Sequence, residues 1–417
     1  MADVVADLSP ERLVGVDWAT EEHAVCVLDP NGRKLSSFSV THSRDGFAKL
    51  VKRLAALGPV GEAPVAIERP DGRLVDCLLE AGHPVVAVSP NAIKAWRESE
   101  VVSGAKSDPG DAEVIAEYLR LRQHKLRVLE PFSADTRALR AVSRARDDLV
   151  AQRVAVHNQL EACLDAFWPG AKDIFADVTS EIALAFVERY PTPTSARGLG
   201  EKRLAAFLTK HGYSGRRSAA ELLARLRAAP EGIGEGPEAE ARRDAVLGYV
   251  RVTRSLNTAI KNLSRSVVAH LGEHPDAEIF TSLPRSGQVN AAQMLAEWGD
   301  CRRAYDGPEA VGALAGLAPV TKRSGKHEAV HFRWACNTRF RVAVTTFADN
   351  SRRASPWAAD IYRRAIARGC DHPHAVRILA RAWVRVIYRC WVDNKPYDPA
   401  IHGGAVRLAP TREAEAA

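Results

Sequence analysis

The sequence lacks the patterns that mark membrane proteins and secreted proteins. Its longest apolar runs are too short, and too often interrupted by charged residues, to span a bilayer. The opening segment MADVVADLSPERL is acidic and has no basic stretch followed by an apolar one, which a secretory signal needs. We therefore expect a cytoplasmic protein with no membrane partner.

Cysteine is scarce, and no group of residues has the spacing of a zinc site. The 7 cysteines are scattered from Cys26 to Cys390 without a CxxC pair, which argues against a zinc knuckle. Cys370, His372 and His374 lie close together, but the rest of a ligand set is missing. We expect the cysteines to be reduced and mostly structural. The chain also has no internal repeat with the period of a solenoid or a propeller.

Arginine, in contrast, is abundant. The formal net charge is +7 and the isoelectric point is about 9.1, a balance that suits a polyanionic partner such as nucleic acid. The chain has 417 residues, of which 46% are hydrophobic and 26% are charged, so it is long enough for two or three globular domains.

The first third of the chain alternates short β-rich segments with helical ones. Valine-rich runs separated by turn residues predict strands at 12–19, 23–29, 34–40, 64–68 and 83–90. Apolar residues at helical spacing predict helices around 45–57, 72–82, 91–99 and 109–123. Three consecutive strands followed by alternating helices and strands are typical of an RNase H-like α/β fold. We assign this fold to residues 1–128.

The pattern of the remaining chain is mainly helical. Heptad-like spacing over 139–167, with arginine at two seam positions, predicts a long coiled-coil helix, and a second such helix covers 246–267. The two helices could pair with each other or with another subunit. The predicted regions are a helical and coiled-coil region at 129–274 with an insert at about 174–236, a mainly α C-terminal domain at 275–403, and a disordered tail at 404–417.

Four carboxylates are placed so that they could meet. Asp17 ends the first predicted strand and Glu68 the fourth, and these strands are neighbours in an RNase H-like sheet. Asp108 and Asp111 open a helix that can lie across the same end, and residues three apart share a helix face. Such a cluster would repel itself without a cation, and Mg²⁺ prefers oxygen ligands. Two Mg²⁺ ions can hold both sides of a phosphoryl displacement.

Each carboxylate also has a purely structural explanation. Asp17 could be a turn residue, and Glu68 could pair with a following arginine. Asp108 and Asp111 could cap the helix, because an Asp-Pro start suits a first turn. All four explanations together, in this order on these elements, are much less plausible than any one. The strand VGVDWAT also resembles the start of sugar kinases and actin-like ATPases, but their later Gly-rich phosphate loops are missing.

Several segments resemble a known family. VGVDWATEEHAVCVLDPNGRKL, AIERPDGRLVDCLLEAGHPVVAVSPNAIKAWRES and AKSDPGDAEVIAEYLRL are similar to the RuvC-like domain of the DEDD insertion-sequence transposases, the bridge-RNA-guided recombinases. TSLPRSGQVNAAQMLAEWGD and PEAVGALAGLAPVTKRSGK resemble the second domain of that family. The matched segments bracket nearly the whole chain.

The resemblance implies an enzyme with two kinds of catalytic residue. The metal-binding acids would be Asp17, Glu68, Asp108 and Asp111, holding Mg²⁺ with two ions per site. Ser324 would attack a DNA phosphodiester and form a covalent phosphoserine link. The residues alone predict less, because a serine hydroxyl needs activation and Ser-Gly can be a simple turn. Considered in this way, Ser282 and Ser286 are rival nucleophiles.

The C-terminal segments carry basic residues suited to phosphate. Where the family often has a Pro-Gly-x-Gly hairpin, this chain reads LPRSGQV, which places Arg285 where it can contact a phosphate backbone. The candidate nucleic-acid-binding residues are Arg285, Lys322, Arg323, Lys326, Arg333, Arg339 and Arg341.

The resemblance also implies partners. They are a structured non-coding bridge RNA and the donor and target double-stranded DNA with which it pairs. The enzyme would be bacterial and nucleoid-associated, and would work as a homo-oligomer, a dimer that forms a tetramer in the synaptic complex, with composite sites. The residues themselves show no RNA-recognition signature of the aromatic-sheet type.

Two other functions compete with this one. The first is a RuvC-like, metal-dependent, structure-selective DNA nuclease that cuts with activated water and without serine chemistry. The second is a non-catalytic nucleic-acid-binding protein, against which the four intact acids argue. Ser324 separates the recombinase from the nuclease.

Overall fold

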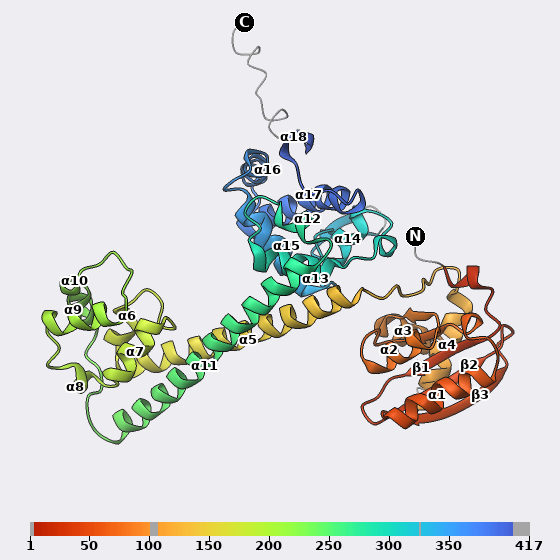
Figure 1. The fold of residues 1–417 in the computed structure, drawn as a ribbon, viewed down its shortest axis with the longest axis horizontal. Helices are drawn as coiled ribbons and strands as arrows, with labels where there is room; N and C mark the ends of the chain where they lie inside the picture. Colours follow the sequence, from red (N-terminus) through yellow and green to blue (C-terminus); the bar gives the residue numbers. More distant parts are fainter. Residues whose placement is uncertain (1–3, 101–106, 325–326, 403–417) are drawn as a thin grey trace, which may run out of the picture. The chain divides into compact units, whose positions relative to one another are not determined.

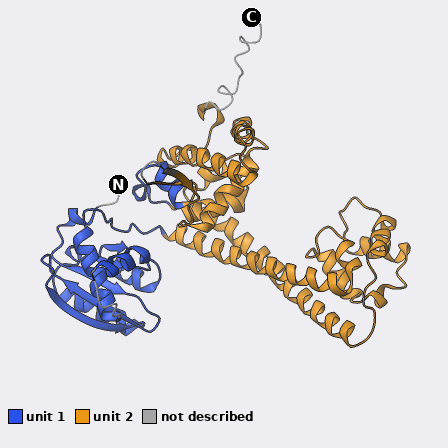
Figure 2. Ribbon diagram, turned by 180° about the vertical axis from the view of Figure 1, so that it is seen from behind, with its two compact units in different colours: residues 1–133, 300–314 blue, residues 134–299, 315–417 orange. Residues whose placement is uncertain are grey.

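The computed structural model describes residues 4–100, 107–324 and 327–402. They form two compact units, which Figure 2 shows in different colours. The first unit comprises residues 1–133 and 300–314, and the second comprises 134–299 and 315–417. The predicted tail at 404–417 and the candidate Lys326 lie outside the described residues.

The first unit is built on a mixed five-stranded sheet with the order β3-β2-β1-β4-β5 (Figure 1). The neighbours β1–β2 and β2–β3 are antiparallel, and β1–β4 and β4–β5 are parallel. The elements are η1 (Val5–Leu8), β1 (Leu13–Asp17), β2 (Glu22–Leu28), β3 (Lys34–Thr41), α1 (Arg44–Ala56), η2 (Val60–Glu62), β4 (Val65–Ile67), α2 (Arg73–Glu80), β5 (Val85–Ala87), α3 (Pro90–Glu100), α4 (Asp108–Arg122), η3 (Arg302–Ala304) and α14 (Pro308–Leu314). The predicted strands and helices of the first third are confirmed, in the predicted order.

Helices cover both faces of the sheet. Successive strand residues point to opposite faces, so they contribute to two separate apolar cores. Val14 and Val16 of β1 belong to a core with Leu50 of α1 and Leu78 of α2. Leu13, which points to the other face, belongs to a core with residues of α3 and α4. A mixed sheet with helices on both faces and this strand order is consistent with an RNase H-like fold.

Two long helices, α5 (Ala134–Phe167) and α11 (Pro237–Glu273), run side by side in the second unit (Figure 1). The predicted seam arginines of α5 contact α11. Arg146 Nε donates to Ser264 Oγ at 3.0 Å, and Arg153 donates to Asn257 Oδ1 at 3.4 Å. The two helices therefore pair within one chain, and their supercoiling stays a prediction.

The insert between these helices has an apolar core of its own. Its elements are α6 (Pro169–Asp173), α7 (Glu181–Arg189), α8 (Pro193–Ala196), α9 (Glu201–Lys210) and α10 (Ala219–Ala228). They pack against residues from the adjoining ends of α5 and α11, such as Leu164 and Val246, around the buried ring of Phe186. The predicted helical insert is thus a small bundle built on the long pair.

The C-terminal part of the second unit is helical with one hairpin. Its elements are α12 (Ala277–Thr281), α13 (Gln288–Trp298), β6 (Val320–Ser324), β7 (His327–His331), α15 (Thr338–Ser351), α16 (Pro356–Ala367), α17 (His372–Val392) and α18 (Pro399–His402). Its interior is aromatic, with Trp298, Phe340 and Trp391 fully buried in edge or tilted contact. Among the described helices of the chain, none has the length and apolar character to cross a membrane.

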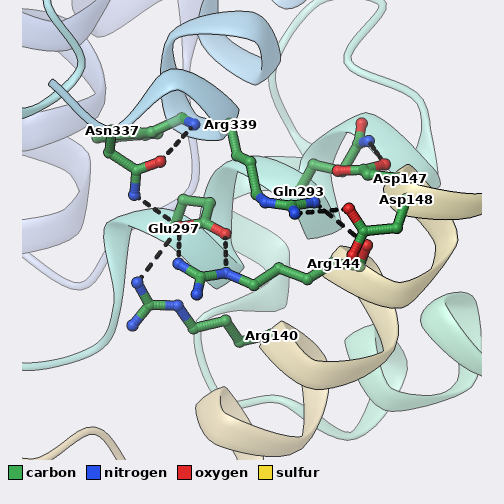
Figure 3. A network of polar contacts seen from close by, with 9 residues as sticks. Arg140, Arg144, Asp147, Asp148, Gln293, Glu297, Asn337 and Arg339 are labelled. Carbon is green, nitrogen blue, oxygen red and sulfur yellow. Dashed lines mark hydrogen bonds and ion pairs between the residues drawn. The ribbon is translucent and has the colours of Figure 1, made fainter. Parts of the chain in front are cut away.

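A buried glutamate ties α5 to this helical part (Figure 3). Glu297 is 4% exposed and accepts hydrogen bonds from Arg144 at 2.7 and 2.8 Å, from Arg140 at 3.3 Å and from Asn337 at 2.7 Å. Burial alone would raise the pKa of Glu297, but the bonds from Arg144 and Asn337 and the charges of the arginines hold it below its ordinary value.

Candidate active site

Asp17 and Glu68 lie at one edge of the sheet. The parallel strands β1 and β4 pair up to Val16 and Ile67, and the two acids are the next residues of each strand path. Both acids are half-buried. Because the carboxyl ends of neighbouring parallel strands meet at the same edge, the predicted neighbourhood of these two acids is present in the backbone.

The first turn of helix α4 is directed toward this edge. A side chain at Gly15 would lie 2.2 Å from the carbonyl oxygen of Ala112, so α4 crosses β1 in direct backbone contact. Leu13 shares a core with Leu119, further along the helix. The helix therefore runs opposite to β1, and its first turn, with Asp108 and Asp111, is directed toward the Asp17 end.

Asp108 is not the N-cap of α4, in contrast to the structural explanation considered for it. Ser107 is the N-cap, and its hydroxyl accepts from the Gly110 amide at 3.3 Å. Asp108 is exposed in the first turn, whereas Asp111 is 7% exposed. Capping therefore does not account for Asp108.

The Asp111 carboxylate forms an ion pair with Arg97 of α3, at 2.9 Å. Within the described part of the chain, no three His, Cys, Asp or Glu side chains are arranged to hold a metal ion. The donor chemistry of the four acids suits Mg²⁺, because all their ligand atoms are carboxylate oxygens. The sequence analysis did not identify Arg97 as a partner of Asp111. The only hint in the sequence is that Arg97 lies in the helix immediately before α4.

The residues that follow the two strand-end acids are held in place. The Arg69 guanidinium lies over the Trp18 ring, 4.4 Å from its centroid, which links the residues after Glu68 and Asp17. The buried His23 Nδ1 accepts from the Ala19 amide at 3.2 Å. Burial, and secondly the charge of His42, lower the pKa of His23 to about 4, which keeps that nitrogen an acceptor at neutral pH.

The three candidate serines have different surroundings. Ser324 is the last residue of β6, pairs with His327 across the hairpin, and belongs to the second unit. The Ser282 hydroxyl is engaged twice, because it donates to the Ile279 carbonyl at 3.0 Å and accepts from the Tyr397 amide at 2.8 Å. Ser286 is 4% exposed. The two rivals are therefore poorly suited to attack DNA.

The basic candidates differ in their exposure and in their contacts. Lys322 and Arg323 are exposed on β6, and Arg285 is exposed with a left-handed backbone (φ 58°). Arg339 is engaged with Asp148 at 2.7 Å and with the Arg144 carbonyl. Arg285 thus occupies the strained position of this turn.

The candidate Arg333 and three arginines of α17 that sequence reasoning did not assign to a site line one cavity. The cavity has a volume of about 540 Å³ and lies between α17 and the segment around β7. Arg333, Arg377, Arg381 and Arg385 line it. The signal in the sequence is the spacing of four between the last three, which places them on one helix face.

Comparison with known proteins identifies the family. A transposase family model matches residues 14–169, and the model of the transposase IS116/IS110/IS902 family matches residues 277–363. The chain is 32% identical over 393 residues to the mini-circle putative transposase for IS117 of Streptomyces coelicolor, covering 92% of this chain and 94% of that one. It is 27% identical over 390 residues to an uncharacterized 42 kDa protein of insertion element IS900 of Mycobacterium paratuberculosis, covering 93% and 97%. The chain therefore belongs to the IS110 family of DEDD transposases.

Proposed function

We propose that this protein is an insertion-sequence transposase that cuts and rejoins donor and target DNA, with a RuvC-like first unit and Ser324 as its nucleophile. The observation that carries the proposal is the edge of the sheet in the first unit. There, Asp17 and Glu68 follow the last paired residues of two parallel strands, and the first turn of α4 is directed to the same end.

The four acids are the proposed Mg²⁺ ligands. Mg²⁺ is usually held by one or two carboxylates together with substrate phosphates, so the full ligand shell belongs to the DNA complex. When bound, the ions stabilise negative charge on the phosphate oxygens. Arg97 pairs with Asp111 at 2.9 Å, so it would hold this carboxylate in position beside a bound cation.

The proposed reaction is a transesterification. The Ser324 oxygen bonds to phosphorus and loses its proton, one sugar oxygen leaves phosphorus and takes up a proton, and the strand remains linked to the protein. A sugar hydroxyl of the other DNA then reverses the step and restores the serine. One phosphodiester replaces another in each step, so the exchange needs no nucleotide hydrolysis.

The proposal includes a structured bridge RNA and a homo-oligomer in which acids and serine of different subunits form composite sites. The support for these partners is the resemblance of the segments around Asp17, Glu68, Asp108 and Ser324 to the RNA-guided family, together with the net charge of +7. The helices of the long α5–α11 pair meet within one chain, so the faces that they turn toward each other are not available to a second subunit.

A covalent-adduct assay tests the proposal. The protein is incubated with the element's end DNA, its flanking non-coding RNA and Mg²⁺, and DNA-linked protein is detected on a denaturing gel. We expect an adduct that requires Mg²⁺ and is lost in Ser324→Ala and Asp17→Asn. Ser214→Ala is a matched control, because Ser214 also precedes a glycine and basic residues, on the exposed surface of the insert.

The outcome separates the recombinase from the nuclease. If Ser324→Ala cuts DNA as the unchanged protein does, and no adduct forms, water is the nucleophile and the RuvC-like nuclease is the better explanation. If Asp17→Asn and Glu68→Gln retain full adduct formation, the acids are structural and the metal proposal is wrong.

A further inference from the structure

An exposed tryptophan follows the serine-bearing hairpin. Trp334 is 82% exposed, whereas the other seven of the chain's eight tryptophans, all within the described residues, are buried or half-buried. The sequence analysis gave Trp334 no role. Tryptophan is enriched at contact surfaces, and an exposed ring of this size leaves much apolar area in water.

The loop that carries Trp334 is held by contacts of Phe332 and Arg341. The Phe332 ring meets the Trp334 ring edge to face at 4.9 Å, and the Arg341 guanidinium lies 4.4 Å from the Phe332 centroid. Arg341 also donates to the Arg333 carbonyl and contacts Cys336 Sγ at 2.6 Å. Arg341 therefore stabilises the loop, and the face of Trp334 is presented on an ordered support.

The basic cavity adjoins this loop. It is lined by Phe332 and Arg333 from the loop and by Arg377, Arg381 and Arg385 from α17, and none of the described residues that line it is acidic. Arg377 and Arg385 are eight residues apart, which is about 12 Å along a helix. A row of that length suits successive phosphates of a strand better than a single anion.

The combination of features identifies the class of ligand. Arginines attract the phosphates of any nucleic acid, and an aromatic ring that is 82% exposed suits bases that are not stacked in a duplex. A protein partner would be expected to bring acidic groups to the cavity and to bury the ring in an apolar socket. The ring and the cavity together match a strand with unpaired bases.

We propose that Trp334 and this cavity bind an unpaired nucleic acid strand, with a base stacked on Trp334 and its phosphates along α17. The inference rests on the nucleic-acid partner of the proposed function, but not on its serine chemistry. The site lies at the base of the hairpin, where Val320 pairs with His331. Ser324 is four residues along β6, about 13 Å at strand rise, so a strand held here would lie beside the hairpin.

The test measures binding of labelled oligonucleotides to the full chain at several salt concentrations. We expect Trp334→Ala to weaken binding of a single strand roughly 10-fold and Trp334→Phe to restore much of it, because stacking needs an aromatic face. Arg377→Ala and Arg385→Ala should each reduce the slope of log affinity against log salt by about 0.7. Ile401→Ala, at an equally exposed apolar position, is the control for Trp334.

A strand with abasic sites, which keeps phosphates but lacks bases, separates the two contacts. We expect Trp334→Ala to have no effect on its binding, whereas the arginine variants still weaken it. Single-stranded DNA and RNA of one sequence are compared to identify the source of the strand. Binding of the single strand that is unchanged in Trp334→Ala overturns the inference, as does a loss that is equal for the abasic strand.

Three further outcomes are informative. If Trp334→Ala changes the sedimentation of the protein without nucleic acid, Trp334 lies in a subunit contact and the inference is wrong. If Trp334→Ala behaves as expected but no serine adduct forms with any DNA, the inference stands and the proposed function fails. If adduct formation is normal and strand binding is unchanged, only the inference fails.

Discussion

Replacing Glu297 by glutamine tests whether the buried carboxylate holds α5 against the C-terminal helices. Glu297 accepts from both Arg144 and Arg140 of α5, and from Asn337 at the start of α15 (Figure 3). Glutamine keeps the shape of the side chain but removes its charge. It also replaces one acceptor oxygen with an NH₂ group that faces arginine donors.

The expected cost follows from the burial of each partner. Glu297 is 4% exposed, so its unmade bonds are not replaced by water, while the Arg140 and Arg144 side chains are 29% and 35% exposed and retain some solvation. Breaking a buried ion pair costs about 3–5 kcal/mol, and the partial exposure of the arginines places this case near 3 kcal/mol. The loss should shrink below about pH 4.5, because the lowered pKa stabilises the fold only where the unfolded carboxyl is ionised.

Urea unfolding of the full chain, followed by tryptophan fluorescence, measures this change, because the neighbouring Trp298 is buried in the same core. Glu238→Gln is the matched control, since Glu238 pairs with Arg242 within one helix at the surface. Its unfolding midpoint should stay unchanged. The reasoning would be refuted if the free energy of unfolding of Glu297→Gln differed from that of the unchanged protein by less than about 0.5 kcal/mol, which is the effect of an ordinary surface substitution.

Three further predictions concern other positions. Arg285→Gly should raise the free energy of unfolding by about 0.5–1 kcal/mol, because glycine relieves the left-handed strain at the cost of some chain entropy, and should weaken DNA binding in a filter assay. Gly15→Ala should destabilise the first unit by about 3 kcal/mol or more in thermal unfolding, since the new methyl would meet the backbone of Ala112 at 2.2 Å. The pKa of His23 is lowered to about 4, so between pH 6.5 and pH 4 only the unfolded chain takes up a proton at this residue. The free energy of unfolding should therefore fall by about 3 kcal/mol as the pH drops through this range. His23→Gln should remove this pH dependence in urea unfolding, and an unchanged pH profile would contradict the assignment.

The sequence predicts the elements of the first unit well, because their signals are local. Alternating valines mark β1 and β2, short runs of β-forming residues mark the other strands, and the order of strands leaves few ways to arrange the sheet. The edge occupied by Asp17 and Glu68 follows from that order, because parallel neighbours end together. Propensity failed at a boundary, where Ser107 and not Asp108 caps α4, since both residue types suit the position.

The partners of individual side chains were beyond sequence reasoning. The pair Arg97–Asp111 and the clamp around Glu297 join residues that are 14 and up to 157 positions apart, which no local spacing encodes. The heptad pattern predicted two long helices but left their partners open, and the contact of Arg153 with Asn257 places them together in one chain. Such pairings depend on the packed fold, because many arginines and acids in the sequence are equally good candidates for each other.

The distribution of the arginines explains why net charge alone could not locate a binding face. The guanidinium groups of Arg339 and Arg144 donate hydrogen bonds to acids and a carbonyl of the second unit, so their charge is already balanced within the fold. The arginines of α17 face a cavity with no acidic residue among the described residues that line it. Arginines of equal charge thus have different surroundings, since those of the first kind tie the fold together and those of the second line the cavity that we propose as a phosphate-binding site. A binding surface of this chain is therefore better sought in the arginines that line a cavity than in its most arginine-rich segment.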